Sequence, residues 1–286
     1  KETYIKLFNE VCIKTADMII NWQRVGFVHG VMNTDNMSIL GHTIDYGPYG
    51  WLEDYDHGWT PNTTDSGQKR YRFGTQPEIV YWNLYQLANA LYPIIEDAPP
   101  LESVLKKFGD NLAVKYLEMM KSKLGLEKED ENDVKLIHDL EDILQLSETD
   151  MTLFFRLLST VTLDDKNEGL MKVWDAFYDS KEIKETIKLK WEEWFVSYSN
   201  RLKIETLSDI ERKKKMNTVN PKYVFRNYMA QLAIDDADKG DYKLIEEFYQ
   251  LFKKPYDEQP ENEKWFAKRP EWARNKVGCS MLSCSS

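Results

Sequence analysis

The sequence predicts a mainly α-helical protein with one small β-hairpin near its start. Apolar residues recur at helical spacing through most of the chain, beginning with residues 3–24. Two short apolar stretches, Met37 to Leu40 and Ile44, flank Gly41 and predict the hairpin. Residues 46–76 have no sustained period and are rich in Gly, Pro, Asp and Thr, which predicts an irregular loop long enough to be functional.

Helical patterns resume after this loop. Pro77 suits a first helical turn, and we expect a helix over residues 78–91. Six further helices are predicted, over residues 101–124, 134–146, 149–160, 168–178, 181–204 and 221–237. Residues 127–133 read as a charged surface break. The basic run Arg212 to Lys215 is interpreted as a solvated turn, with RNA binding as the less favoured alternative. Residues 257–269 are interpreted as surface loop.

Composition narrows the function classes. The chain has 286 residues, 42% of them hydrophobic, so it can bury the core of one large or two smaller domains. A net charge of −10 argues against nucleic-acid or anionic-membrane partners. No apolar run approaches the roughly 20 residues that span a bilayer, so we expect a soluble protein. The chain begins with Lys1 and enters a helical pattern directly, which predicts that it is part of something longer.

Three cysteines are present. Cys12 is expected to pack as a small hydrophobe in the first helix. Cys279 and Cys284 lie in the last nine residues, which predict a mobile polar tail. Two exposed thiols there could exchange disulfides or be oxidised, whereas their isolated spacing argues against zinc.

The chemistry concentrates at Asp35, Asn36 and Asp45. If the hairpin forms, Asn36 and Asp45 emerge side by side at its open end. An amide oxygen and a carboxylate are hard donors that suit Mg²⁺, or Mn²⁺, carrying a phosphate chain. Asp and Asn are also ordinary turn residues, so each alone is more often structural. Their combination with the following long loop favours a phosphoryl- or nucleotidyl-transfer site, while His29 is expected to pack and bond backbone.

The protein-kinase signature offers a comparison. There an HRD…N loop supplies a base and a metal-binding Asn, and a DFG Asp binds the metal as well. Aligning His29 with the signature His places Val31 where the base belongs. Asn36 then falls on the metal-binding Asn, and Asp45 begins the DFG-like DYG. The metal ligands are kept and the usual base is missing, which is typical of a pseudokinase.

Longer motifs give a specific resemblance. The segments are HGVMNTDNMSILGHTIDYGP (29–48), WTPNTTDSGQKRYRFGTQPEIVYWNL (59–84), MNTVNPKYVFRNYMAQLAIDDADKGDY (216–242) and KRPEWARNKVGCSMLSCSS (268–286). Together they resemble the SelO (selenoprotein O, pseudokinase-like) family. The resemblance implies a kinase-like fold that binds ATP in a flipped orientation and transfers AMP to Ser, Thr or Tyr hydroxyls of proteins. It also implies that Asp35 takes the proton of the hydroxyl, while Asn36 and Asp45 hold the metal and Asp45 contributes to the nucleotide site.

The same resemblance implies a domain organisation. Residues 1–100 would be the core of the C-terminal kinase-like lobe, with catalytic loop, DFG-like motif and activation-type loop. Residues 101–256 would be its helical remainder and extension, and residues 257–286 a polar tail with two cysteines. Nothing before residue 26 resembles the nucleotide-gripping N-lobe, so the isolated chain is expected to bind ATP poorly.

Three points stay open at this stage. The alternative function is a non-catalytic pseudokinase-like scaffold or protein-binding module; an ordinary kinase is disfavoured by Val31. Some relatives carry a Cys in the activation-type loop that can bond a C-terminal Cys, and Pro61 stands there in this sequence, which argues against that redox switch. A cytoplasmic or mitochondrial location is equally compatible with the sequence.

Overall fold

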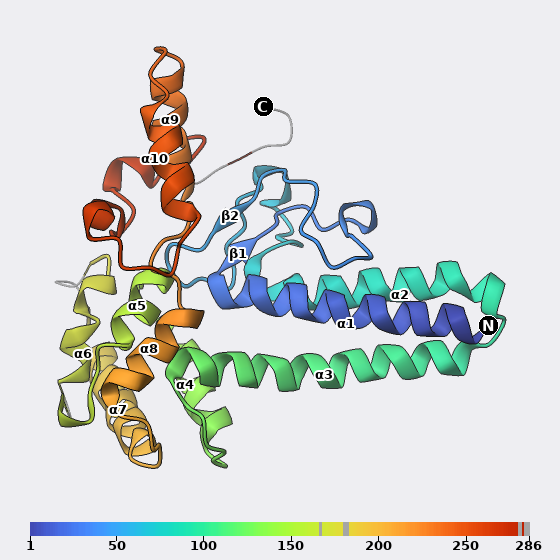
Figure 1. The fold of residues 1–286 in the computed structure, drawn as a ribbon, viewed down its shortest axis with the longest axis horizontal. Coiled ribbons are helices and arrows are strands. Elements are labelled where there is room, and N and C mark those ends of the chain that lie inside the picture. Colours follow the sequence, from blue (N-terminus) through green and yellow to red (C-terminus); the bar gives the residue numbers. More distant parts are fainter. Residues whose placement is uncertain (166–167, 180–182, 280–281, 283–286) are drawn as a thin grey trace.

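A computed structural model describes residues 1–165, 168–179, 183–279 and 282 of the chain. It is mainly helical, with two short strands among the described residues (Figure 1). The α-helices are α1 (Glu2–Val25), α2 (Gln76–Ile95), α3 (Ala98–Leu124), α4 (Asp133–Leu144), α5 (Met151–Leu158), α6 (Gly169–Lys172), α7 (Glu185–Leu202), α8 (Asp209–Val219), α9 (Asn227–Ala237) and α10 (Lys243–Phe252). The strands are β1 (Phe27–Val28) and β2 (Gly50–Trp51).

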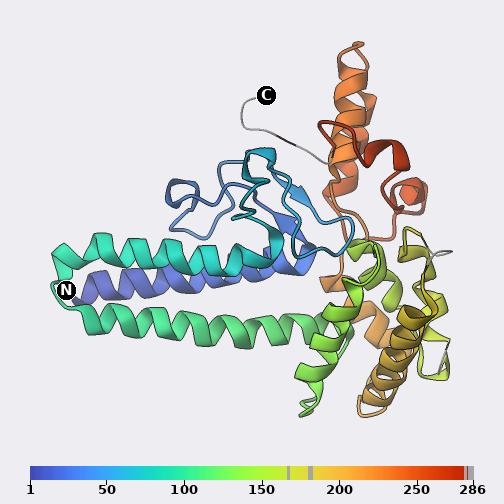
Figure 2. The same ribbon diagram turned by 180° about the vertical axis from the view of Figure 1, so that it is seen from behind.

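The helices α1, α2 and α3 lie side by side and form an elongated arm (Figures 1 and 2). The buried face of α1 explains the helical period of the sequence, because its buried residues include Phe8, Val11, Cys12, Thr15, Ile19 and Trp22. These side chains join one core cluster with buried residues of α2 and α3. Gly26 ends α1 in the left-handed conformation (φ 73°), a common way to close a helix.

A second core lies at the other end of α3. Trp191 of α7 is fully buried there, with ring centroids 5.3 Å from Phe154 and 5.4 Å from Phe177. Helices α4, α5, α6 and α7 supply most of this cluster. A third, smaller cluster joins α9 and α10 to the C-terminal segment and includes Tyr228, Phe248 and Cys279. None of the described helices is both long and apolar enough to cross a lipid bilayer.

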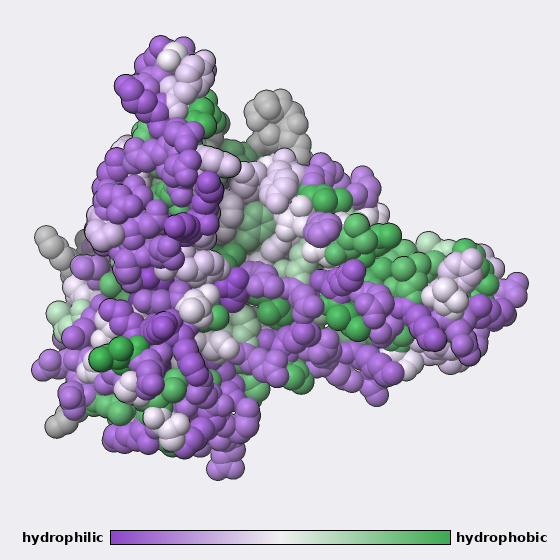
Figure 3. Space-filling model, viewed as in Figure 1, coloured by the Kyte–Doolittle hydropathy of each residue, from purple (hydrophilic) through white to green (hydrophobic). Residues whose placement is uncertain are grey.

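The small sheet forms at different residues from those predicted. Strand β1 pairs antiparallel with β2, Phe27 opposite Trp51 and Val28 opposite Gly50. The prediction of strands at Met37 to Leu40 and Ile44 is wrong, since that segment is irregular in the structure. Two of its apolar residues face outward, since Ile39 is 54% and Leu40 56% exposed, whereas Met37 packs against the core cluster of α1, α2 and α3. Figure 3 shows apolar side chains gathered over α2 and the loop beside it.

Gly41 explains why the segment turns instead of pairing. It has a φ of 71°, and a Cβ there would lie 2.8 Å from the carbonyl oxygen of Lys14 in α1. The loop therefore folds down against α1 at Gly41, which leaves no partner strand for its apolar residues.

Several other predictions need correction. The run Arg212 to Lys215 is not a solvated turn but part of α8, which begins with a capping box between Ser208 and Glu211. Arg212 is 1% exposed, and its Nη1 lies 2.7 Å from the Asp209 carboxylate. The helix predicted over residues 168–178 is the short α6 and a 3-10 turn at Trp174–Ala176, and the one predicted over residues 221–237 starts only at Asn227.

The described part of the C-terminal region contains more regular structure than predicted. Helix α10 was not expected, and a 3-10 turn occupies Pro260–Trp265 within the predicted loop. Cys279 is 5% exposed and packs in the third cluster, so the prediction that its thiol is exposed is wrong. Cys284 lies outside the described residues. Cys12 is buried in α1, as predicted.

Candidate active site

His29 lies at the centre of the candidate site. It follows β1 directly, is 1% exposed and stacks on Trp22 of α1 with ring centroids 5.5 Å apart. The backbone N–H of Val31 donates to its Nδ1 at 3.4 Å, and its Nε2 lies 2.8 Å from the carbonyl oxygen of Ile44. Both bonds form together only when Nδ1 accepts and Nε2 carries the proton. The expectation that His29 packs and bonds backbone is confirmed.

Side-chain amides hold the backbone that surrounds His29. The carbonyl oxygens of four residues from β1 and the following loop each accept a hydrogen bond from an Asn or Gln side chain. The pairs are Gln76 to Phe27 at 2.9 Å, Asn62 to Gly30 at 3.1 Å, Asn36 to Val31 at 2.9 Å and Asn83 to Met32 at 3.0 Å. Such bracing fixes the loop before any ligand arrives, which a catalytic constellation requires.

Gly30 lets this loop approach the segment that follows Asp45. Its φ is 81°, a conformation that side chains other than glycine rarely adopt. A Cβ at this position would lie 2.3 Å from the carbonyl oxygen of Pro48. Only glycine therefore fits between the two backbones.

The three predicted site residues lie on two segments. Asp35 and Asn36 belong to the 3-10 turn Thr34–Asn36, where Asp35 is exposed and Asn36 partly buried. Asp45 is exposed and has a φ of 58°, which Asp tolerates better than most residues. Through Val31 and Ile44, the two segments bond the same imidazole of His29. The structure therefore connects Asn36 to the neighbour of Asp45, although no bond joins their side chains in the described residues.

The donor set suits a magnesium ion that is bound mainly through phosphate. Nδ2 of Asn36 is committed to Val31, so Oδ1 remains as an oxygen donor, and Asp45 adds a carboxylate. Within the described residues no group of three or more His, Cys, Asp or Glu could hold a metal ion by itself. Mg²⁺ commonly takes one or two protein oxygens and completes its shell with substrate phosphates and water. Asn36 and Asp45 fit that pattern better than that of a closed structural site.

Sequence reasoning missed the residues that support the site. Gln76 and Asn83 are almost fully buried on an otherwise apolar face of α2, and Asn62 is buried in the long loop. A buried amide in an apolar stretch is the signal that could have drawn attention to them. Beside them, the hydroxyl of Tyr71 donates to Asn33 at 2.5 Å, next to the turn that carries Asp35.

The long loop also contacts the C-terminal segment. Leu282 pairs with residues 61–63 through backbone: its N–H donates to the carbonyl oxygen of Pro61 at 2.9 Å, and its own carbonyl accepts from the N–H of Thr63 at 2.8 Å. The contact includes Pro61, which stands where the family resemblance implies a loop cysteine in some relatives.

Comparison with known proteins decides the family. A family model described as protein adenylyltransferase SelO matches residues 1–254. The chain belongs to the SelO family. Relatives named protein nucleotidyltransferase YdiU match nearly all of it: the protein of Flavobacterium johnsoniae is 60% identical across 100% of this chain and 55% of its own length. Those of Rhodopirellula baltica and Aromatoleum aromaticum are each 50% identical over 98% of this chain, covering 54% and 53% of their lengths.

This SelO chain thus spans about half the length of the curated relatives that it matches. The matched half includes the loop around His29 and the segment with Asp45, because the family model covers both. The activity in the relatives' names belongs to proteins nearly twice as long.

Proposed function

We propose that this chain is the catalytic-loop half of a protein adenylyltransferase, which transfers AMP from ATP to Ser, Thr or Tyr hydroxyls of proteins. The observation that carries the proposal is the link through His29 between the Asn36 turn and the Asp45 segment. Membership of a family described as protein adenylyltransferase supports it. We further propose that the fold is the C-terminal lobe of a kinase-like domain.

Each site residue has a role in this proposal. Asp35 is exposed and adjacent to Asn36, so its carboxylate can accept the proton of an incoming hydroxyl. The hydroxyl oxygen forms a bond to the α-phosphorus of ATP, and the bond from that phosphorus to the bridging oxygen breaks as pyrophosphate leaves. Asn36 and Asp45 would hold Mg²⁺, which supplies neutralisation of phosphate charge. His29 and the amide braces keep these groups in position.

The groups that grip ATP are proposed to come from outside this chain. The relatives extend over nearly twice its length, and the sequence before the His29 loop contains no glycine-rich phosphate-binding motif. The chain alone is therefore expected to bind ATP weakly. Tests of transfer consequently need the full-length protein.

The decisive experiment compares ATP labelled at the α-phosphate with ATP labelled at the γ-phosphate. Full-length protein should transfer only the α-label, and mass spectrometry should find AMP on a hydroxyl residue. Asp45→Ala should abolish metal-dependent transfer. Asp35→Asn should lower transfer about 100-fold or more while nucleotide binding persists, because general-base catalysis contributes factors of this order.

Asp110→Asn is the matched control, because it removes an exposed carboxylate from α3, away from the site. Transfer of the γ-label would replace the proposal with a kinase reaction. Absence of any Mg²⁺-dependent nucleotide binding in the full-length protein would favour a non-catalytic scaffold. Unchanged transfer by Asp45→Ala would remove Asp45 from the metal site.

A further inference from the structure

A cavity of about 650 Å³ lies between α1, α3 and α4, apart from the site around His29. Its volume falls in the range of small-molecule binding sites. Its walls are mostly apolar and include Ile19, Ile20, Leu112, Leu117, Val134 and Ile137. Glu141 of α4 and Tyr116 of α3 also line it.

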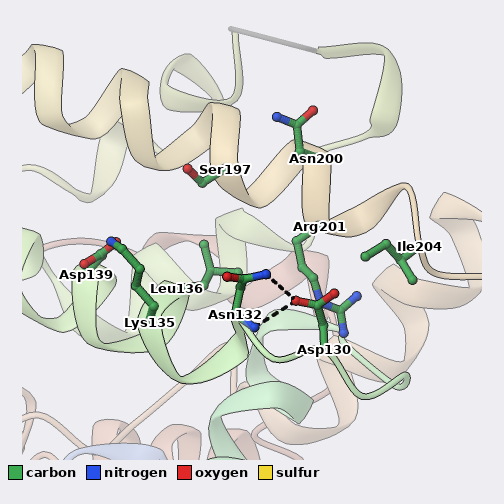
Figure 4. A pocket seen from close by; sticks show the side chains of 9 residues that line it. All are labelled: Asp130, Asn132, Lys135, Leu136, Asp139, Ser197, Asn200, Arg201 and Ile204. Carbon is green, nitrogen blue, oxygen red and sulfur yellow. Dashed lines mark hydrogen bonds and ion pairs between the residues drawn. The ribbon is translucent and has the colours of Figure 1, made fainter.

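The cavity differs from the more polar one shown in Figure 4, which has a volume of about 370 Å³ and lies between α4 and α7. There Asp130 accepts hydrogen bonds from Asn132 (Figure 4). Arg201 forms ion pairs with Asp133 at 2.6 Å and Glu205 at 2.7 Å. In that cavity the buried cation Arg201 is paired with two carboxylates. The larger cavity is lined by Glu141 without a lysine or arginine to pair with it.

The Glu141 carboxyl group has no cationic partner among the described residues. Its Oε1 accepts hydrogen bonds from the hydroxyls of Tyr55, at 3.3 Å, and Tyr116. No ion pair within the described ranges includes Glu141, and neither lysine nor arginine lines the cavity. Burial raises the pKa of both phenols well above the ordinary value, so both hydroxyls keep their protons and donate to the Glu141 carboxyl group. His138, the basic side chain of the lining, lies 3.4 Å from Asp142.

The cavity wall also contains Gly109, the only glycine within α3. A glycine weakens a helix interior relative to alanine, and close packing is the usual compensation. Here a Cβ would meet nothing within 4 Å, so no neighbour requires the missing side chain. Gly109 is exposed, and the missing side chain leaves this part of the cavity wall open.

We propose that this cavity binds a small molecule with an apolar body and a cationic head, a primary alkyl- or arylalkylammonium. The ammonium group pairs with the carboxylate of Glu141, and the body packs against the apolar side chains of α1 and α3. An amine fits because the site offers apolar surface beside a partly buried carboxyl group that has no cationic partner among the described residues. The site is independent of the proposed AMP transfer.

The test titrates the protein with three probes that share one body: 4-phenylbutylammonium, 4-phenylbutanol and 4-phenylbutyrate. Binding is followed by ligand-observed NMR, and dissociation constants come from titration. The ammonium should bind about tenfold more tightly than the alcohol, because a charge-assisted hydrogen bond is worth about that factor, and the carboxylate should bind worst.

Two variants test the residues. Glu141→Gln keeps an oxygen that accepts from both tyrosines but removes the charge, so the preference for ammonium over alcohol should vanish. Asp139→Asn removes a carboxylate on the same helix outside the cavity lining and should leave the preference intact. Gly109→Leu adds a bulky side chain to the cavity wall at a position where a Cβ meets nothing within 4 Å, and it should weaken both ligands about tenfold or more. Thermal unfolding confirms that each variant is folded.

Equal binding of ammonium and alcohol by the wild type would overturn the proposal. So would a preference that survives Glu141→Gln, or ammonium binding that Gly109→Leu leaves unchanged. No binding of any probe would show that the cavity does not take ligands of this class.

Discussion

The imidazole of His29 bonds the carbonyl oxygen of Ile44 at 2.8 Å, immediately before Asp45, and accepts a hydrogen bond from the N–H of Val31. His29→Phe keeps a ring that can stack on Trp22 but leaves both backbone groups without their partner. Two partly buried hydrogen bonds are lost, so we expect the free energy of unfolding to fall by about 1–3 kcal/mol. AMP transfer by the full-length protein should fall at least about tenfold, because the hydrogen bond that holds the backbone next to Asp45 is lost.

Chemical denaturation measures the first effect, and α-label transfer at a temperature where the variant is folded measures the second. His138→Phe is the control, since the His138 side chain is 71% exposed. A His29→Phe protein with wild-type transfer would show that the link through the imidazole does not position Asp45.

Gly30 and Gly240 form a matched pair for a second prediction. Both have a positive φ, 81° and 84°, but a Cβ at Gly30 would lie 2.3 Å from the carbonyl oxygen of Pro48, while one at Gly240 would meet nothing within 4 Å. Gly240→Ala should lower the free energy of unfolding by about 1 kcal/mol, because alanine is strained in the left-handed conformation even where its Cβ meets no neighbour. Gly30→Ala should cost at least about 2 kcal/mol more, because backbone atoms must shift. Denaturant unfolding measures both, and equal costs would refute the close approach at Pro48.

The helical part of the fold was largely predictable because its signal is local. The stripe from Phe8 to Trp22 on α1 repeats at helical spacing, so burial on one face could be inferred without a partner. The prediction of a hairpin was wrong because its outcome depends on a contact between distant residues. Ile39 and Leu40 have a strand-like composition but are exposed, and the turn of Gly41 against Lys14 depends on a contact with α1 that local sequence does not encode.

The residues of the candidate site also differ in whether local sequence could predict them. Asp35, Asn36 and Asp45 were found from their spacing, and the role of each stays a prediction until transfer is measured. The braces could not be found from spacing, because Gln76 and Asn83 reach back 49 and 51 residues to the carbonyl oxygens they hold. Only the packing of α2 beneath the loop brings these amides to it.

Arg226 and Asp150 form a buried, two-pronged ion pair with distances of 2.6 and 2.9 Å. Burial alone would lower the pKa of Arg226, but the carboxylate of Asp150 outweighs it and holds the pKa above its ordinary value. Asp150 also caps α5 through the N–H of Leu153 at 3.0 Å. Arg226→Met leaves that carboxylate buried without its cation, so we expect a loss of about 3–5 kcal/mol in unfolding free energy.

The exposed pair between Lys135 and Asp139 is the control, and Lys135→Met should change stability by less than about 1 kcal/mol. The double variant Asp150→Asn with Arg226→Met should lose less than the sum of the single variants, because the second change removes an already unpaired charge. Strict additivity in denaturant unfolding would mean that the two side chains do not interact in solution.

Cys12 supplies a prediction that depends on pH. Burial raises the pKa of its thiol to about 12, so at pH 8 roughly one molecule in 10⁴ carries the thiolate, against about one in four for an ordinary thiol. Native protein should therefore react with iodoacetamide at Cys12 on the order of 10³-fold more slowly than unfolded protein, as measured by peptide mass spectrometry. The unfolded chain releases its proton at lower pH, so this thiol should make stability decline as pH rises from about 9 toward 12. Cys12→Ala should flatten that decline, and rapid native-state labelling of Cys12 at pH 8 would contradict its burial in α1.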